Sequence, residues 1–201
     1  MSARRAGYLL LMMLASLPLW ADAIPYPDAG TIAPTVTLIA GATGNITGYF
    51  YGFSASDTDE VQMCDVTQSY CSPYVFDNQT TAPGTSFVFD SLVTAGDVLV
   101  FNLENLTTGK VLSSDPGASA DLINHAYVTP YSGTGGPAGI PAGIFVGMED
   151  LTVPGSDLDY NDDQFVFTNV AVNSVPEPAS LILLATSMLA IGLAAKRKLQ
   201  A

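Results

Sequence analysis

Short hydrophobic stretches with a period of two residues recur through the middle of the chain. In one of them Leu99, Phe101 and Leu103 would share one face of an extended strand, while Asn102 and Glu104 share the other. No stretch of the central region shows a long helical period. The pattern predicts an all-β domain with the fold of a β-sandwich, for which the jelly roll is one of the topologies considered. The stretches rich in β-branched and aromatic residues, with Gly, Pro, Asn and Asp between them, are residues 35–40, 46–53, 86–92, 97–106, 143–150 and 164–173.

Two segments of the central region carry no clear pattern. Residues 121–128 fit a short helix as well as a strand. Residues 131–143 are rich in Gly and Pro, which predicts a loop that connects strands, with a binding loop as the alternative.

The N-terminal residues have the order of a secretory signal peptide. Arg4 and Arg5 precede an apolar stretch, and Ala21 and Ala23 supply the small residues of a cleavage site. We therefore expect residues 1–23 to be removed on export. A retained anchor or a buried core helix is the alternative.

A second apolar run, residues 179–195, lies near the other end of the chain and carries no charge. Its length is at the short end of what spans a bilayer, for which about 17 to 25 residues are needed. Lys196, Arg197 and Lys198 follow it and would stay on the cytoplasmic side, which places the acidic domain outside. The pattern predicts a transmembrane helix, with a buried C-terminal helix as the alternative.

The segment 174–201 combines three elements in a fixed order. Val175, Pro176, Glu177 and Pro178 come first, and the apolar run and the basic tail follow. The two prolines disfavour helix, which would hold the motif extended outside the membrane. This order resembles the PEP-CTERM sorting signal of exported bacterial proteins. The resemblance implies a substrate of exosortase, a membrane-embedded cysteine transpeptidase-like enzyme, an anchored intermediate at the inner membrane, and a final place at the cell surface or in an exopolysaccharide-rich matrix.

The strong negative charge of the chain limits the kinds of molecule that it can bind. The chain has a net charge of −13, and residues 24–173 hold 17 acidic residues against a single base, Lys110. Nucleic acid is excluded as an expected partner, because phosphate contacts need Lys and Arg. Metal cations fit the charge.

Acidic residues are densest just before the last hydrophobic stretch. In an extended segment Asp157, Asp159 and Asn161 would point to one side, with Glu149 or Asp150 available from the preceding stretch. Calcium prefers six to eight oxygen ligands of this kind. The candidate calcium ligands are Glu149, Asp150, Asp157, Asp159, Asn161 and Asp162.

The acidic segment is not an EF-hand. With Asp157 as the first position, Asp162 stands where Gly is required and Thr168 where Glu is required. An acidic turn, in which Asp and Asn side chains cap backbone N–H groups, remains the alternative to a calcium site.

The same segment resembles the end of an uncharacterised domain of bacterial surface proteins. The shared features are a Gly-x-Glu-Asp-Leu stretch at residues 147–151 and an Asp-x-Asp-Tyr-Asn-Asp stretch at residues 157–162, with Asn124, His125 and Ala126 upstream. That family carries no established activity, so the resemblance implies a surface module without a mechanism.

Cys64 and Cys71 are the only cysteines. An exported chain meets an oxidising compartment, so an even pair predicts a disulfide. Zinc binding by two thiols alone is disfavoured, because structural zinc sites use four ligands.

We expect no enzymatic activity. His125 is the only histidine, no nucleophile elbow is present, and the many carboxylates single out no catalytic pair. We therefore expect His125 to be a packed or hydrogen-bonded structural residue. The function that the sequence favours is a structural or exopolysaccharide-associated surface protein, stabilised by calcium. The alternatives are a carbohydrate-binding module and, third, a glycan-active hydrolase. The aromatic platform of such a binding module would be Tyr49, Tyr51, Tyr127 and Tyr131.

Overall fold

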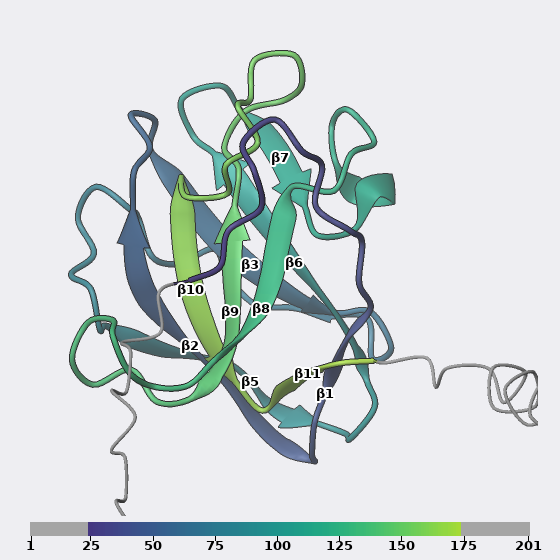
Figure 1. Ribbon diagram of the computed structural model, residues 1–201. Coiled ribbons are helices and arrows are strands. Elements are labelled where there is room, and N and C mark those ends of the chain that lie inside the picture. Colours follow the sequence, from purple (N-terminus) through teal and green to yellow (C-terminus); the bar gives the residue numbers. More distant parts are fainter. Residues whose placement is uncertain (1–23, 174–201) are drawn as a thin grey trace, which may run out of the picture.

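The computed structural model describes residues 24–173, where eleven strands form two antiparallel sheets (Figure 1). One short 3₁₀ turn, Pro116–Ala118, is the only helical element of this region. This arrangement agrees with the predicted β-sandwich. The strands are β1 Leu38–Ala40, β2 Gly44–Phe53, β3 Asp59–Asp65, β4 Tyr70–Cys71, β5 Ser86–Val93, β6 Val98–Asn105, β7 Lys110–Ser113, β8 Ala126–Tyr131, β9 Gly143–Met148, β10 Asp163–Thr168 and β11 Val170–Val172.

The first sheet has the strand order β11-β1-β6-β3-β4, and β7 also pairs with β6. The second sheet has the order β5-β2-β10-β9-β8. Neighbouring strands of the second sheet therefore come from both ends of the described chain, since β2 lies beside β10. This long-range pairing places the acidic segment that precedes β10 next to the end of β2.

The core lies between the two sheets and is largely aromatic. In β6 the burial alternates strictly, so that Leu99, Phe101 and Leu103 face inward, as the sequence predicts. Phe101 meets Phe167 of the opposite sheet with ring centroids 4.2 Å apart. Gly48 makes room for this packing, because a Cβ there would lie 2.5 Å from the ring of Phe89.

The prediction of one strand over residues 164–173 is wrong, because the chain changes sheets within it. β10 belongs to the second sheet and β11 to the first, with Asn169 between them at a φ of 62°. The Asn169 side chain accepts a hydrogen bond from the Ala42 N–H and donates to the Ala42 and Asn45 carbonyls. Asn tolerates this left-handed conformation better than most residues.

The predicted disulfide is present and joins Cys64 of β3 to Cys71 of β4. The two cysteines are directly opposite each other in this antiparallel pair. The sequence pattern does not predict β3, whose residues 59–65 include two Asp, one Glu and one Gln. The strand is nevertheless well buried, because Val61 and Met63 belong to the hydrophobic core.

His125 is packed and hydrogen-bonded, as expected. It is fully buried, and its Nε2 lies 2.9 Å from Asp121 Oδ1. The other Asp121 oxygen accepts a hydrogen bond from the Val153 N–H. Burial acts to raise the pKa of Asp121, but the hydrogen bonds from His125 and Val153 lower it overall. The sequence leaves helix and strand open for residues 121–128. In the structure residues 121–125 form a loop, and residues 126–128 are the first three of β8.

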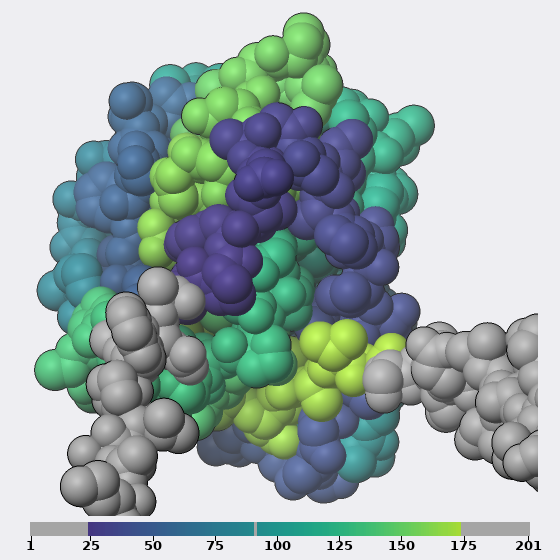
Figure 2. Space-filling model, in the orientation of Figure 1, coloured from purple at the N-terminus to yellow at the C-terminus, as the bar shows by residue number. Residues whose placement is uncertain are grey.

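The outer face of the second sheet is covered by the start of the described chain. The first of these residues, drawn in purple, lie across β8, β9 and β10 (Figures 1 and 2). Tyr26 packs edge-on against Phe145, and the Tyr127 hydroxyl donates a hydrogen bond to the Pro25 carbonyl. The Gly/Pro-rich loop covers the same face, where Ile140 is buried.

The predicted signal peptide, sorting motif, transmembrane helix and basic tail fall on residues 1–23 and 174–201, outside the described residues. Within residues 24–173 no helix has the length and hydrophobicity that crossing a bilayer requires.

Candidate functional site

The acidic residues gather at one end of the sandwich, where strands of both sheets begin or stop. β9 ends at Met148, which pairs with Asp163 at the start of β10. Asp163 also pairs with Phe53 at the end of β2. The loop 149–162 therefore leaves from and returns to adjacent strands, and it forms the projecting tip of the domain (Figure 1).

The buried Glu149 side chain holds the backbone of this loop through hydrogen bonds. Its carboxylate is fully buried and accepts hydrogen bonds from the Ser156 hydroxyl and from the backbone N–H groups of Leu158, at 3.1 Å, and Tyr160. Burial raises the pKa of Glu149, although these hydrogen bonds act in the opposite direction. One carboxylate thus accepts hydrogen bonds from donors spread over residues 156–160, and of these donors the Leu158 N–H has a second acceptor in the Ser156 hydroxyl.

The loop is not extended, contrary to the geometry that the sequence reading assumed. Leu158 and Tyr160 have φ values of 54° and 58°. Both side chains are buried, and the Tyr160 hydroxyl accepts a hydrogen bond of 2.7 Å from the Ala33 N–H. These two residues therefore turn inward and leave the residues between and beside them facing out.

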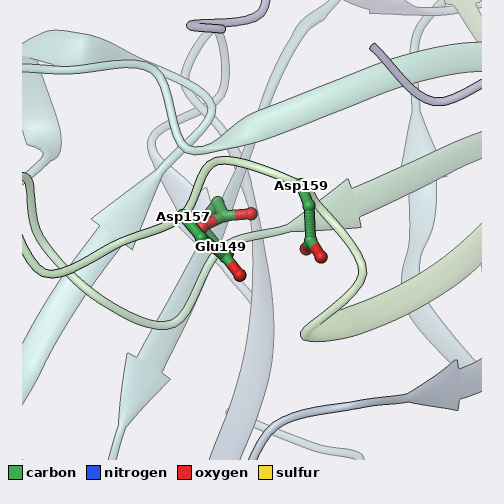
Figure 3. Close-up of side chains that lie close together, drawn as sticks. All are labelled: Glu149, Asp157 and Asp159. Carbon is green, nitrogen blue, oxygen red and sulfur yellow. The ribbon is translucent and has the colours of Figure 1, made fainter. Parts of the chain in front are cut away.

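The turns still bring three of the predicted ligands together. Glu149, Asp157 and Asp159 each offer a carboxylate oxygen, and these atoms all lie within 4.8 Å of one another (Figure 3). We call these three residues the outer group. Asp157 is exposed and Asp159 half-buried, while Glu149 lies beneath them. Asn161 joins the outer group indirectly, because its backbone and side-chain N–H groups both donate to Asp159.

The remaining two predicted ligands, Asp150 and Asp162, do not belong to the outer group. They line a pocket of about 350 Å³ together with Asp57 and with Asp157 of the outer group. One Asp162 oxygen accepts a hydrogen bond of 3.1 Å from the Asp150 N–H. Burial, followed by the charges of neighbouring carboxylates, raises the pKa of Asp150 to about 6 and that of Asp162 to about 7. The structure thus places Asp150 and Asp162 outside the outer group, and Asp157 lies both in that group and at the pocket.

Close enough to feel the charges of Asp150 and Asp162 lies a carboxylate pair that is not among the predicted ligands. Asp59 and Asp163 are both fully buried. Asn78 joins them, since its side-chain N–H₂ lies 3.0 Å from Asp59 Oδ2 and 3.4 Å from Asp163 Oδ2. Burial raises the pKa of Asp59 to about 7, and burial together with the charge of Asp59 raises that of Asp163 well above its usual value. We call Asp59 and Asp163 the buried pair.

No basic side chain offsets these charges. Lys110 is the only Lys or Arg in residues 24–173, and its ammonium donates to the Thr152 hydroxyl. Within residues 24–173 the only other basic side chain near a carboxylate is His125, beside Asp121, and it carries a charge only when protonated. Protons or cations from solution are therefore what can offset the carboxylates at this end of the sandwich.

Comparison with known proteins identifies the other predicted functional segment. Residues 174–198 match a family model, described as the PEP-CTERM protein-sorting motif. No curated protein and no solved structure matches the chain. The match confirms the sorting motif predicted around Val175, Pro176, Glu177 and Pro178. It supports an exported protein that is sorted by exosortase, through a membrane-anchored intermediate, to the cell surface.

Proposed function

We propose that this protein is a structural module of the bacterial cell surface, processed by exosortase, stabilised by calcium and associated with exopolysaccharide. The observation that carries the proposal is the PEP-CTERM motif at residues 174–198, which begins directly after β11 and so follows the last strand of the sandwich. A sorting segment in this position would present the whole β-domain as cargo.

A structural role fits the described domain better than catalysis. The single histidine is fully buried and engaged by Asp121, so it could not act on a substrate from solution without rearrangement. Glu149 is occupied by loop donors, which favours a role in shape over one in acid–base chemistry.

Calcium would bind at the outer group. Glu149, Asp157 and Asp159 supply oxygen ligands only, which suit a hard divalent cation, and water would complete the coordination. A bound cation would relieve the repulsion among the three carboxylates, which is about 1 kcal/mol per pair at 4 Å in water and about 4 kcal/mol at a protein surface.

The proposed association with exopolysaccharide rests on the sorting class alone, because charge by itself opposes it. The domain is strongly acidic, so direct contact with an anionic polysaccharide would be repulsive. Divalent cations bound at the acidic end would offset this repulsion, because one cation can be coordinated by protein carboxylates and by glycan acidic groups at the same time.

The described tyrosines give less support to a carbohydrate-binding platform. Tyr131 is only 3% exposed. Tyr51 stands edge-on to Tyr131 and to Phe145, and Tyr127 packs beside Tyr26. Rings engaged edge-to-face under a covering segment do not present the open flat face on which a sugar stacks.

The proposed sorting is tested in the producing bacterium. A variant with Pro176→Ala, Glu177→Ala and Pro178→Ala should remain in the inner-membrane fraction at its unprocessed size, while the wild-type chain reaches the surface fraction. The matched control carries Pro83→Ala, at an exposed position outside both the motif and the acidic loop. Equal processing of the motif variant and the control, or unchanged processing in cells without exosortase, would contradict the proposal.

A further inference from the structure

The buried pair joins the two sheets. Asp59 is the first residue of β3 in the first sheet, and Asp163 is the first residue of β10 in the second sheet. Asn78 holds the pair in place, because its side chain donates toward both carboxylates and accepts a hydrogen bond of 3.1 Å from the Asp59 N–H. The two carboxylates are thus fixed by backbone and by an amide, and do not swing freely.

Each member of the pair has an oxygen that is left without a partner. Asp59 Oδ1 and Asp163 Oδ1 are buried and accept no hydrogen bond from any described residue. An unpaired carboxylate oxygen away from water carries a desolvation cost of several kcal/mol, and two like charges side by side increase it. Such oxygens require a proton or a cation between or beside them.

Carboxylates near the pair could supply further oxygen ligands, and a pocket lined by some of them could admit a cation from solvent. The charges of Asp150 and Asp162 act on Asp163, and those of Asp57 and Asp162 act on Asp59. Asp57, Asp150 and Asp162 also line a pocket open to solvent, to which Asp157 of the outer group contributes as well. A shared proton would join the two orphaned oxygens but leave one negative charge, whereas a divalent cation would offset both charges and attract these additional carboxylates.

We propose that Asp59 and Asp163 form a second divalent-cation site, distinct from the outer group, in which a calcium ion entering through the pocket of Asp57, Asp150 and Asp162 ties the two sheets together. The ligands are all oxygens, as calcium prefers, and the outer group is not needed to complete the site. The site extends the calcium part of the proposed function but does not depend on the outer group being occupied.

The test separates the two groups by matched double variants of the full chain, purified in mild detergent. One carries Asp59→Asn and Asp163→Asn, and the other carries Asp157→Asn and Asp159→Asn. Isothermal titration with CaCl₂ alone counts the binding events, and calorimetric melting in chelator and in CaCl₂ reports folding. Because Asn is isosteric and uncharged, the buried-pair variant should melt at a higher temperature than the wild type in chelator, which shows that it folds.

The wild type should bind two calcium ions, and the buried-pair variant should lose one binding event and most of the calcium-dependent rise in melting temperature. The outer-group variant should keep that rise. If the buried-pair variant binds calcium as the wild type does, the second site is refuted, while loss of binding in the outer-group variant would still support the outer site. If the wild type binds no calcium, both sites fail, and exosortase sorting remains to be judged by cell fractionation alone.

Discussion

The buried carboxylate of Glu149 accepts a hydrogen bond of 3.1 Å from the backbone N–H of Leu158, across nine positions of the chain. This contact is the central fixing point of the acidic loop, because the same carboxylate also accepts from Ser156 and Tyr160. It explains physically why a Glu follows β9 at this distance from the Asp-rich turn.

Glu149→Ala should destabilise the domain more than a surface substitution does. The Tyr160 N–H would lose its acceptor and the Leu158 N–H would keep only the Ser156 hydroxyl, and an unsatisfied buried donor costs about 1–3 kcal/mol. Glu149→Gln keeps one acceptor oxygen and should cost less. Urea unfolding of both variants measures the effect, with Glu104→Gln, on the half-buried face of β6, as the control. Equal stability of Glu149→Ala and the control would show that the loop does not depend on the hydrogen bonds to Glu149.

Calcium should raise the free energy of unfolding. A ligand that binds only the folded chain stabilises it by about 2.7 kcal/mol when present at 100 times its Kd. The same concentration of MgCl₂ should stabilise less, because Mg²⁺ demands a tighter octahedral shell. Calorimetric melting with each salt, at matched ionic strength, checks this. Identical shifts with both salts would point to general screening of charge.

In chelator, stability should fall as the pH rises from about 4 to about 7. The pKa of Asp59 and of Asp162 is raised from 3.8 to about 7 in the folded state, and that of Asp150 to about 6. Between these limits the folded chain holds more protons than the unfolded chain, so the free energy of unfolding decreases with pH. Urea unfolding at a series of pH values in chelator measures the slope. Asp162→Asn should flatten it, and a slope of the opposite sign would refute the expectation.

Loss of the Cys64–Cys71 bond should cost stability without changing the fold. The bridge closes a short loop with a sequence separation of 7, for which the chain-entropy model gives about 2.5 kcal/mol. A variant with Cys64→Ser and Cys71→Ser should therefore unfold at lower urea concentration. Reduction of the wild type should shift its midpoint to the same place, and a reducing agent should leave the variant unchanged.

Gly48→Ala should destabilise the core, and Gly52→Ala on the same strand should not. A Cβ at Gly48 would lie 2.5 Å from the Phe89 ring and 2.7 Å from the Phe167 ring, whereas one at Gly52 meets no atom within 4 Å. Overpacking of this kind costs about 1–3 kcal/mol. Thermal melting of the two variants makes the comparison, and similar melting temperatures would mean that the rings shift without strain.

The local pattern of the sequence was sufficient for several features. Alternation in β6 identifies its inward residues, since a strand puts successive side chains on opposite faces whatever its neighbours are. The cysteine pair predicts its own bond because only two cysteines exist. The order of Pro-Glu-Pro, apolar run and basic tail predicts the sorting motif because each element is read along the chain.

Other features depended on pairing between distant segments. The strand predicted over residues 164–173 is broken at Asn169 because the two halves find partners in different sheets, and a continuous hydrophobic pattern does not record that change. β3 is not predicted because its core residues Val61 and Met63 are outnumbered by polar ones, and only the packing of the folded domain shows that they are buried.

The acidic site shows most clearly which features the sequence determines and which depend on the tertiary structure. The sequence by itself determined that the segment 149–163 is rich in carboxylates and has no base to offset them. Tertiary structure alone decided which carboxylates meet. Asn78 lies 19 positions from Asp59 and 85 from Asp163, yet its side chain contacts both. The physical reason is that side-chain spacing along one strand is local, whereas the convergence of two sheets at a common end is fixed by the packing of the whole core.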